Sequence, residues 1–161
     1  MPVPGSIAIA AVSFNQNADF LKMILEGLSD EEWVRRPSGA NHLLWIVGHV
    51  CWARGTVLNR LGEDWSKPWF SHFGRGAKLD ESAAYPTPKE AMLAWDESSV
   101  RLNAAMESVS EDVLAAPSTQ GPPSADGKVS GVVNFLAYHE TYHLGQVSYL
   151  RSWLGHPGVM G

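Results

Sequence analysis

Apolar residues recur at spacings of three and four along four stretches of the chain, which is the period of a helix that buries one face. The stretches run from Ile7 to Leu28, from Leu43 to Leu61, from Met92 to Val109 and from Val132 to Trp153. No stretch alternates apolar and polar residues long enough to indicate a strand. The pattern predicts an all-α protein, a four-helix bundle with long crossover loops.

Capping residues indicate where these helices begin and end. Thr87 followed by Pro88 fits an N-cap and the first position of the third helix. Gly155 is typical of the position just beyond the end of the fourth helix. Ser29 and Glu32 fit a capping box, which predicts one extra turn after the first helix.

Residues 62–86 and 110–128 form two long connections that are rich in Gly, Pro and Ser. Connections of this length are uncommon in a compact bundle unless they cross its length or line a site. We expect the first to carry the chain back along the bundle, so that the second and third helices run parallel. A chain of 161 residues suits a single domain, residues 1–161.

Composition excludes several classes of protein. The net charge is −5 and the 12 Lys and Arg residues are scattered, which argues against a nucleic-acid-binding surface. Cys51 is the only cysteine, so neither an intrachain disulfide nor a cysteine zinc finger can form. The longest apolar run, residues 7–12, is far shorter than the roughly 20 residues that span a bilayer. No Lys or Arg precedes Lys22, unlike the start of a secretory signal. We expect a cytoplasmic protein that binds neither nucleic acid nor a membrane.

The fourth helix carries polar residues where its inward face should be apolar. Its middle inward positions are His139, His143 and Gln146. Two histidines four residues apart lie about 40° apart around the helix and about 6 Å apart along it, so both rings can reach one metal ion. His49, midway along the second helix, offers a third ligand. Three neutral imidazoles and an open position suit zinc or nickel, and iron less specifically.

The other candidate residues have simpler interpretations. A histidine on an apolar face often bonds a carbonyl or a tyrosine in the core, so a metal-free bundle remains an alternative. His42 lies about 10 Å along the helix from His49, which favours a capping or surface position. We expect His72 and His156 to be exposed to solvent. Cys51 lies about 200° around the helix from His49, which favours a buried small side chain over a nucleophile.

Residues 139–143 read His-Glu-Thr-Tyr-His, which matches the zinc-protease motif H-E-x-x-H. One class of these proteases needs a Gly and a His where this chain has Gln146 and Tyr149. The other needs a later Glu, and no acidic residue follows Glu140. We therefore do not expect a protease of this kind. Glu140 remains a candidate catalytic base, with an exposed helix charge as the alternative.

Two segments of the predicted helices read NHLLWIVGHVCWA (residues 41–53) and HETYHLGQVSYLRSWLG (residues 139–155). They resemble the DinB-like (DinB/YfiT) superfamily of metalloenzymes, and the similarity extends over nearly the whole chain. The resemblance implies a four-helix bundle, often a homodimer, in which His49, His139 and His143 hold a divalent metal. Gln146 matches a further family position, where it would support a ligand from behind.

Some members of this family are transferases, and one is an isomerase, that use low-molecular-weight thiols. We therefore expect thiol S-transferase chemistry on a small molecule, in which the metal stabilises a thiolate. A metal-dependent hydrolase and a non-catalytic metal-binding stress protein are the alternatives. Trp45, Trp52 and Trp69 are candidate walls of an aromatic pocket, or ordinary packing. Arg75 and Lys78 are candidates for contact with a substrate carboxylate, or solvated loop charges.

Overall fold

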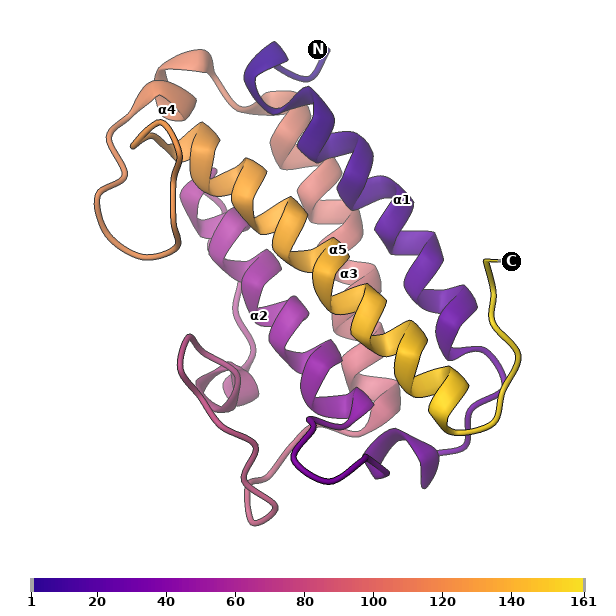
Figure 1. Ribbon diagram of the computed structural model, residues 1–161. Coiled ribbons are helices and arrows are strands. Elements are labelled where there is room, and N and C mark those ends of the chain that lie inside the picture. The colour runs from indigo at the N-terminus through magenta and orange to yellow at the C-terminus, as the bar shows by residue number, and fades with distance from the viewer. Residues whose placement is uncertain (1, 161) are drawn as a thin grey trace.

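Four long helices pack together in the computed structural model, which describes residues 2–160 (Figure 1). No strand occurs among these residues, so the predicted all-α bundle is confirmed. Short 3₁₀ segments precede the first long helix (Gly5–Ile7) and lie in the connections from the first to the second (Glu32–Val34) and from the second to the third (Pro68–His72). The long helices, with the short α4, are α1 (Ala8–Leu25), α2 (Leu43–Arg60), α3 (Pro88–Ser108), α4 (Glu111–Ala115) and α5 (Val129–Trp153).

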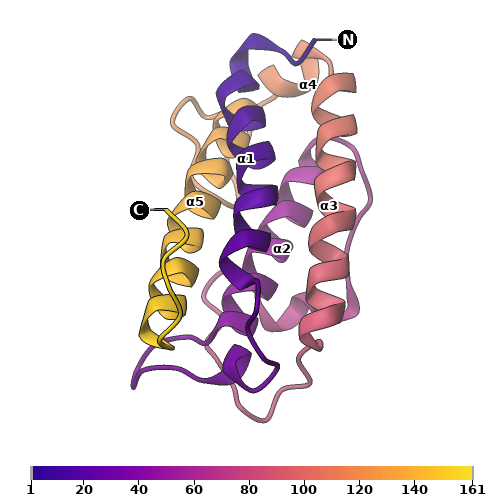
Figure 2. The same cartoon turned by 90° about the vertical axis from the view of Figure 1, so that its right-hand side faces the viewer.

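The long helices form two parallel pairs. Cys51 of α2 contacts the Ala91 carbonyl of α3, and further along both helices Arg54 bonds Ser99. This confirms that α2 and α3 run in the same direction. α1 and α5 also run side by side in one direction, opposite to that of α2 and α3 (Figures 1 and 2). As a result α2 lies antiparallel to α5, and the middles of these two helices meet.

The capping residues lie where the sequence places them. The Thr87 hydroxyl accepts the Glu90 backbone N–H, and the Glu90 carboxylate accepts the Thr87 N–H at 2.7 Å, so the capping box of α3 is complete. Of the two hydrogen bonds expected in the capping box at Ser29 and Glu32, one forms. The Ser29 N–H donates to the Glu32 carboxylate at 2.8 Å, but the Ser29 hydroxyl accepts no backbone N–H from the described residues. Gly155 follows α5 with a φ of +92°, a left-handed conformation that favours glycine.

The connection between α2 and α3 folds back onto α2. Gly48 and Gly55 of α2 face the rings of Phe73 and Phe70 so closely that a Cβ at either position would overlap them. These two glycines, two turns apart, form the shallow surface on which the loop packs. The loop backbone is thereby held next to the middle of α2, beside His49.

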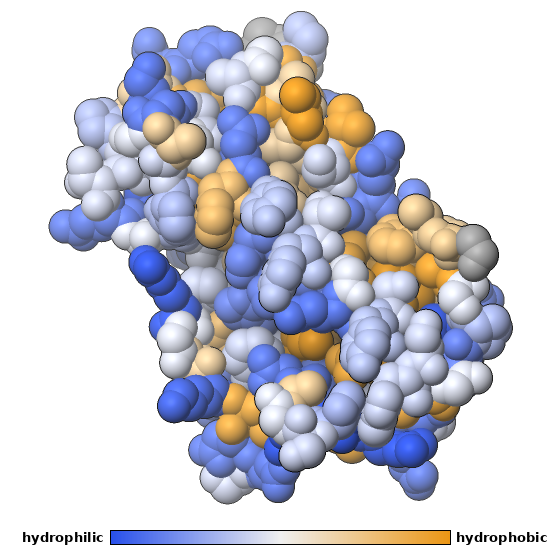
Figure 3. All heavy atoms as spheres, in the orientation of Figure 1, coloured by the Kyte–Doolittle hydropathy of each residue, from blue (hydrophilic) through white to orange (hydrophobic). Residues whose placement is uncertain are grey.

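The apolar core lies between the four long helices. The largest fully buried side chains include Trp95, whose indole N–H donates to the Ala18 carbonyl of α1 at 3.2 Å. Polar side chains cover most of the face seen in Figure 3, and apolar side chains gather on it in smaller patches. Among the described residues, no helix has both the length and the apolar character that crossing a membrane requires.

Candidate metal centre

Three imidazole rings meet where the middles of α2 and α5 pack together. The Nε2 atom of His139 lies 3.2 Å from that of His49 and 3.0 Å from that of His143. The ligand atoms of all three rings lie within 4.8 Å of one another. In a tetrahedral site with metal–nitrogen bonds of about 2.0–2.1 Å, the nitrogens are separated by roughly 3.3 Å. Two of the three pairs therefore lie close to the spacing that one metal ion requires, and all three ligand atoms are near enough to hold one ion.

Oxygen atoms hold the outer nitrogens of two of these rings. The Nδ1 atom of His49 lies 2.7 Å from the Phe73 carbonyl oxygen, and that of His143 lies 2.7 Å from Oε1 of Gln146. Since these oxygens only accept, each Nδ1 carries the hydrogen, and each Nε2 presents a lone pair to the centre. Histidine ligands of metals are held in the same way, by an acceptor on the far nitrogen.

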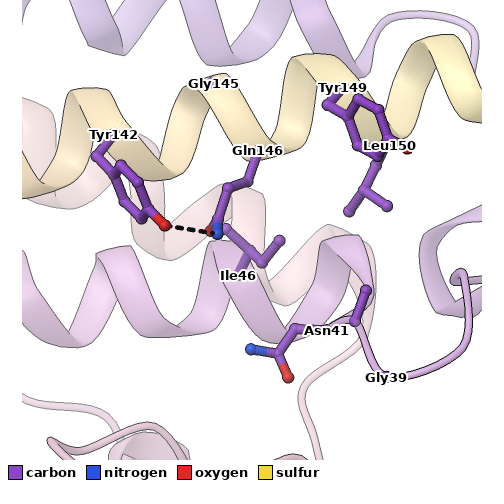
Figure 4. Close-up of a pocket in the computed structure, with 9 residues that line it drawn as sticks. Gly39, Asn41, Ile46, Tyr142, Gly145, Gln146, Tyr149 and Leu150 are labelled. Carbon is purple, nitrogen blue, oxygen red and sulfur yellow. Dashed lines mark hydrogen bonds between the residues drawn. The ribbon is translucent and has the colours of Figure 1, made fainter.

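Gln146 is itself oriented by a neighbour. Its amide nitrogen donates to the Tyr142 hydroxyl at 3.3 Å, as the close-up in Figure 4 shows. The amide oxygen is then free to accept from His143. Gln146 therefore contacts His143 at the nitrogen that does not face His139.

The donor set fits a divalent ion better than it fits hydrogen bonds within the cluster. His49 and His143 both aim lone pairs at Nε2 of His139, which carries one hydrogen at most. The Nδ1 atom of His139 is buried and has no hydrogen-bond partner among the described residues. A cation at the centre accepts all three lone pairs at once. Three neutral nitrogens are a donor set for zinc, nickel or iron(II).

Burial keeps the three rings in the form that binds metal. Desolvation, with a smaller contribution from the neighbouring rings, lowers the pKa of His139 and of His143 to about 4. Burial also lowers the pKa of His49, against the opposing effect of its bond to Phe73. Metal ions bind the neutral imidazole, so at neutral pH no proton has to leave these rings first.

Glu140 points into the core and not to solvent. Its side chain is buried, and its two oxygens bond Nε and Nη2 of Arg54 at 2.6 and 2.9 Å. The amide of Asn17 donates to the same carboxylate at 3.2 Å. The interpretation of Glu140 as an exposed helix charge is therefore wrong. The buried Arg54 guanidinium draws its carboxylate into the core as a counter-ion. With both oxygens engaged, the geometry also gives no support to Glu140 as a catalytic base.

Arg54 is the residue at this site that the sequence analysis missed. It is fully buried, its guanidinium lies 3.3 Å from the centre of the Trp95 ring, and it bonds Ser99 at 2.6 Å. The available signal was its position, four residues after Val50 on the inward face of α2. A lone arginine on such a face indicates a buried acidic partner, because an unpaired charge there is very costly.

Two of the three candidate tryptophans flank a ligand. Trp45 precedes His49 in α2 by about one turn, and Trp52 follows it by about one turn. Both stack on the His49 ring, with ring-centre distances of 5.1 and 5.5 Å. They confine the imidazole to one orientation. Trp69 packs instead against Phe70 in the loop and does not line the cavity next to the histidines.

A cavity of about 320 Å³ opens beside His49 and His139. Both long connections contribute to its wall, the first through Arg75 and the second through Pro122 and Pro123. The loops therefore line a site, which was one of the two explanations of their length.

A second cavity, of about 530 Å³, lies where the start of α2 and the loop before it face the C-terminal half of α5 (Figure 4). Its lining includes Gln146, Tyr142 and Ile46, so the amide that holds His143 faces it. Only the smaller cavity contacts the ligand rings themselves.

The remaining candidates lie away from the three rings. His42 is buried and caps α2 by accepting a backbone N–H at 3.0 Å, which confirms a capping position and excludes a surface one. His72 and His156 are half-buried and not fully exposed as expected, because His72 packs among loop aromatics and His156 lies 2.7 Å from Glu32. Cys51 is buried, as expected.

Comparison with known proteins identifies the family. A search of curated proteins gave no match. The model of the DinB superfamily matches residues 13–147, a range that includes all three histidines of the cluster and most of the bundle. The match covers well over half of the chain, and the all-α fold and the three-histidine cluster agree with it. The chain belongs to the DinB superfamily.

Proposed function

We propose that this protein is a metal-dependent enzyme of the thiol S-transferase type, acting on a small molecule with a low-molecular-weight thiol as co-substrate. The observation that carries the proposal is the convergence of three Nε2 atoms beside a cavity. The bound ion, zinc or nickel, supplies a Lewis acid that favours the thiolate form of a sulfur ligand at neutral pH. His49, His139 and His143 would hold it.

The residues around the ligands fix their geometry. The Phe73 carbonyl and Gln146 select the tautomers of His49 and His143. Trp45 and Trp52 hold the His49 ring from both sides. Ligands positioned in this way need little rearrangement when substrate enters, which is how a rigid site lowers the cost of reaction.

The same contacts give no support to hydrolysis that is assisted by a carboxylate base. Such a base must be free to reach the attacking water. Glu140 is the acidic residue next to a ligand in the chain, and its oxygens are bonded to Arg54 and Asn17. No carboxylate belongs to the ligand group among the described residues. A metal-stabilised thiolate is already a nucleophile and needs no such base.

Metal analysis of untagged protein tests the site. We expect about one divalent ion per chain in the parent and in His72→Ala, which alters a histidine outside the cluster. We expect none in His139→Ala, with its helical circular dichroism unchanged. Metal retained by His139→Ala would exclude the three-histidine site.

Cobalt substitution then tests the chemistry. A small thiol such as mercaptoethanol should give the Co(II)-loaded parent a sulfur-to-cobalt charge-transfer band. A spectrum unchanged by thiol would exclude the transferase and leave a metal-binding protein without this activity. The homodimer and the cytoplasmic location expected from the sequence belong to the same proposal, and sedimentation of the metal-loaded protein tests the dimer.

A further inference from the structure

The cavity beside the histidines has one cationic side chain among its described lining residues, because burial keeps the two imidazoles there neutral at neutral pH. Arg75, from the connection between α2 and α3, lines it together with His49 and His139. Among the described residues that line this cavity none is acidic. The net charge of the side chains that line the cavity is therefore positive, and a ligand that carries a negative group meets no repulsion from them.

The guanidinium of Arg75 is anchored but not neutralised. Its Nη1 donates to the Gly121 carbonyl at 3.0 Å, which ties it to the second long connection. It forms no ion pair within residues 2–160, whereas Arg36, Arg54 and Arg101 each pair with a glutamate. A guanidinium has five N–H donors in a planar fork that matches a carboxylate, so most of its donors remain for a ligand.

The rest of the wall is apolar. Trp52 and Phe135 contribute aromatic rings, and Pro122 and Pro123 close the side formed by the second connection. The volume of about 320 Å³ is that of a small-molecule site. Such a wall suits a compact apolar body, and the arginine adds a requirement for one anionic group.

We propose that this cavity binds a small organic carboxylate, with its carboxylate paired to Arg75 and its apolar body between Trp52 and Phe135. This inference rests on the proposed function. If the protein is a thiol S-transferase, the bound carboxylate is the substrate that meets the thiol at His49 and His139. It assigns a chemical class to the substrate, and it assigns Arg75 the role of selecting that class.

Benzoate and benzyl alcohol test the proposal, because they share a ring and differ in charge. Calorimetric titration is done first on metal-free protein, in which a carboxylate cannot bind through a metal ion. We expect the parent to bind benzoate about tenfold more tightly than benzyl alcohol, as a charge-assisted bidentate contact gives. Arg75→Gln should abolish this preference. Lys78→Gln removes a charge from the same loop outside the cavity lining and should retain it.

Three results would overturn the proposal. They are the absence of binding of both compounds, equal affinity for both in the parent, and an equal loss of preference in Arg75→Gln and Lys78→Gln. Repeating the titrations with zinc-loaded protein separates this proposal from the proposed function. Failure to take up zinc would remove the enzyme while leaving the preference of the metal-free protein intact. A protein that takes up zinc but shows no preference for benzoate would overturn this proposal and leave the proposed function intact.

Discussion

The side chains of Arg54 and Glu140 form a two-bond ion pair that is shielded from solvent, and Glu140 directly follows the candidate ligand His139 in the chain. The pair joins α2 to α5 next to the metal centre. Asn17 of α1 and Ser99 of α3 bond the same two side chains, so one polar network touches all four long helices. A buried pair of this kind adds little net stability compared with an apolar core, but it specifies which residues lie opposite one another.

Replacing one member of this pair should be severe. In Glu140→Gln the Arg54 charge stays buried without its counter-ion, and we expect the free energy of unfolding to fall by about 3–5 kcal/mol. Urea denaturation measures the loss. Asp96→Asn is the matched control, because it breaks a half-exposed pair with Lys22 and should cost less than about 1 kcal/mol. Equal losses in the two variants would contradict the special role of the buried pair.

Gln146 should control metal affinity and leave the fold unchanged. Gln146→Ala removes the acceptor for Nδ1–H of His143, and loss of such a contact lowers metal affinity by about 10- to 100-fold. Competition with a chromophoric chelator measures the affinity. Gln146→Glu keeps an acceptor at the same place and should bind at least as tightly as the parent. A similar loss in both variants would show that the contact does not act through His143.

Gly48 should couple the loop to the metal site. A methyl group at Gly48→Ala meets the Phe73 ring, so the loop must shift and the Phe73 carbonyl moves away from His49. We expect lower thermal stability and weaker zinc binding together. Gly145→Ala is the control, since nothing lies within 4 Å of the added carbon there and the helix gains up to about 1 kcal/mol. Unchanged zinc binding in Gly48→Ala would contradict the coupling.

Cys51 should make the protein less stable at alkaline pH. Burial raises the pKa of its thiol to about 12, from an ordinary value of 9.0. The unfolded chain therefore loses this proton first as pH rises, and the stability that the thiol contributes at neutral pH is lost above pH 9. Between pH 7 and 10 the loss should be about 1.4 kcal/mol larger in the parent than in Cys51→Ala. Parallel pH profiles of the unfolding free energy would contradict this.

The sequence predicted what residue type and spacing determine. Histidines four apart on one helix, with a third in the middle of another, were enough to select the three rings that cluster in the structure, because helix geometry places the first two without tertiary information. The partner of Arg54 could not be selected in this way, since the pair depends on how α2 and α5 pack. The Phe73 carbonyl left no signal at all. Every residue has a carbonyl, and only the folded loop determines which one reaches His49.

That carbonyl has a consequence for how His49 is held. The acceptor that orients His49 belongs to a loop, while the ligands belong to the long helices. Local opening of a loop requires less free energy than unfolding of the bundle. Opening of the loop alone would therefore remove the acceptor on Nδ1 of His49 while every long helix stays folded. The orientation of one candidate ligand thus depends on closure of a loop as well as on the stability of the bundle.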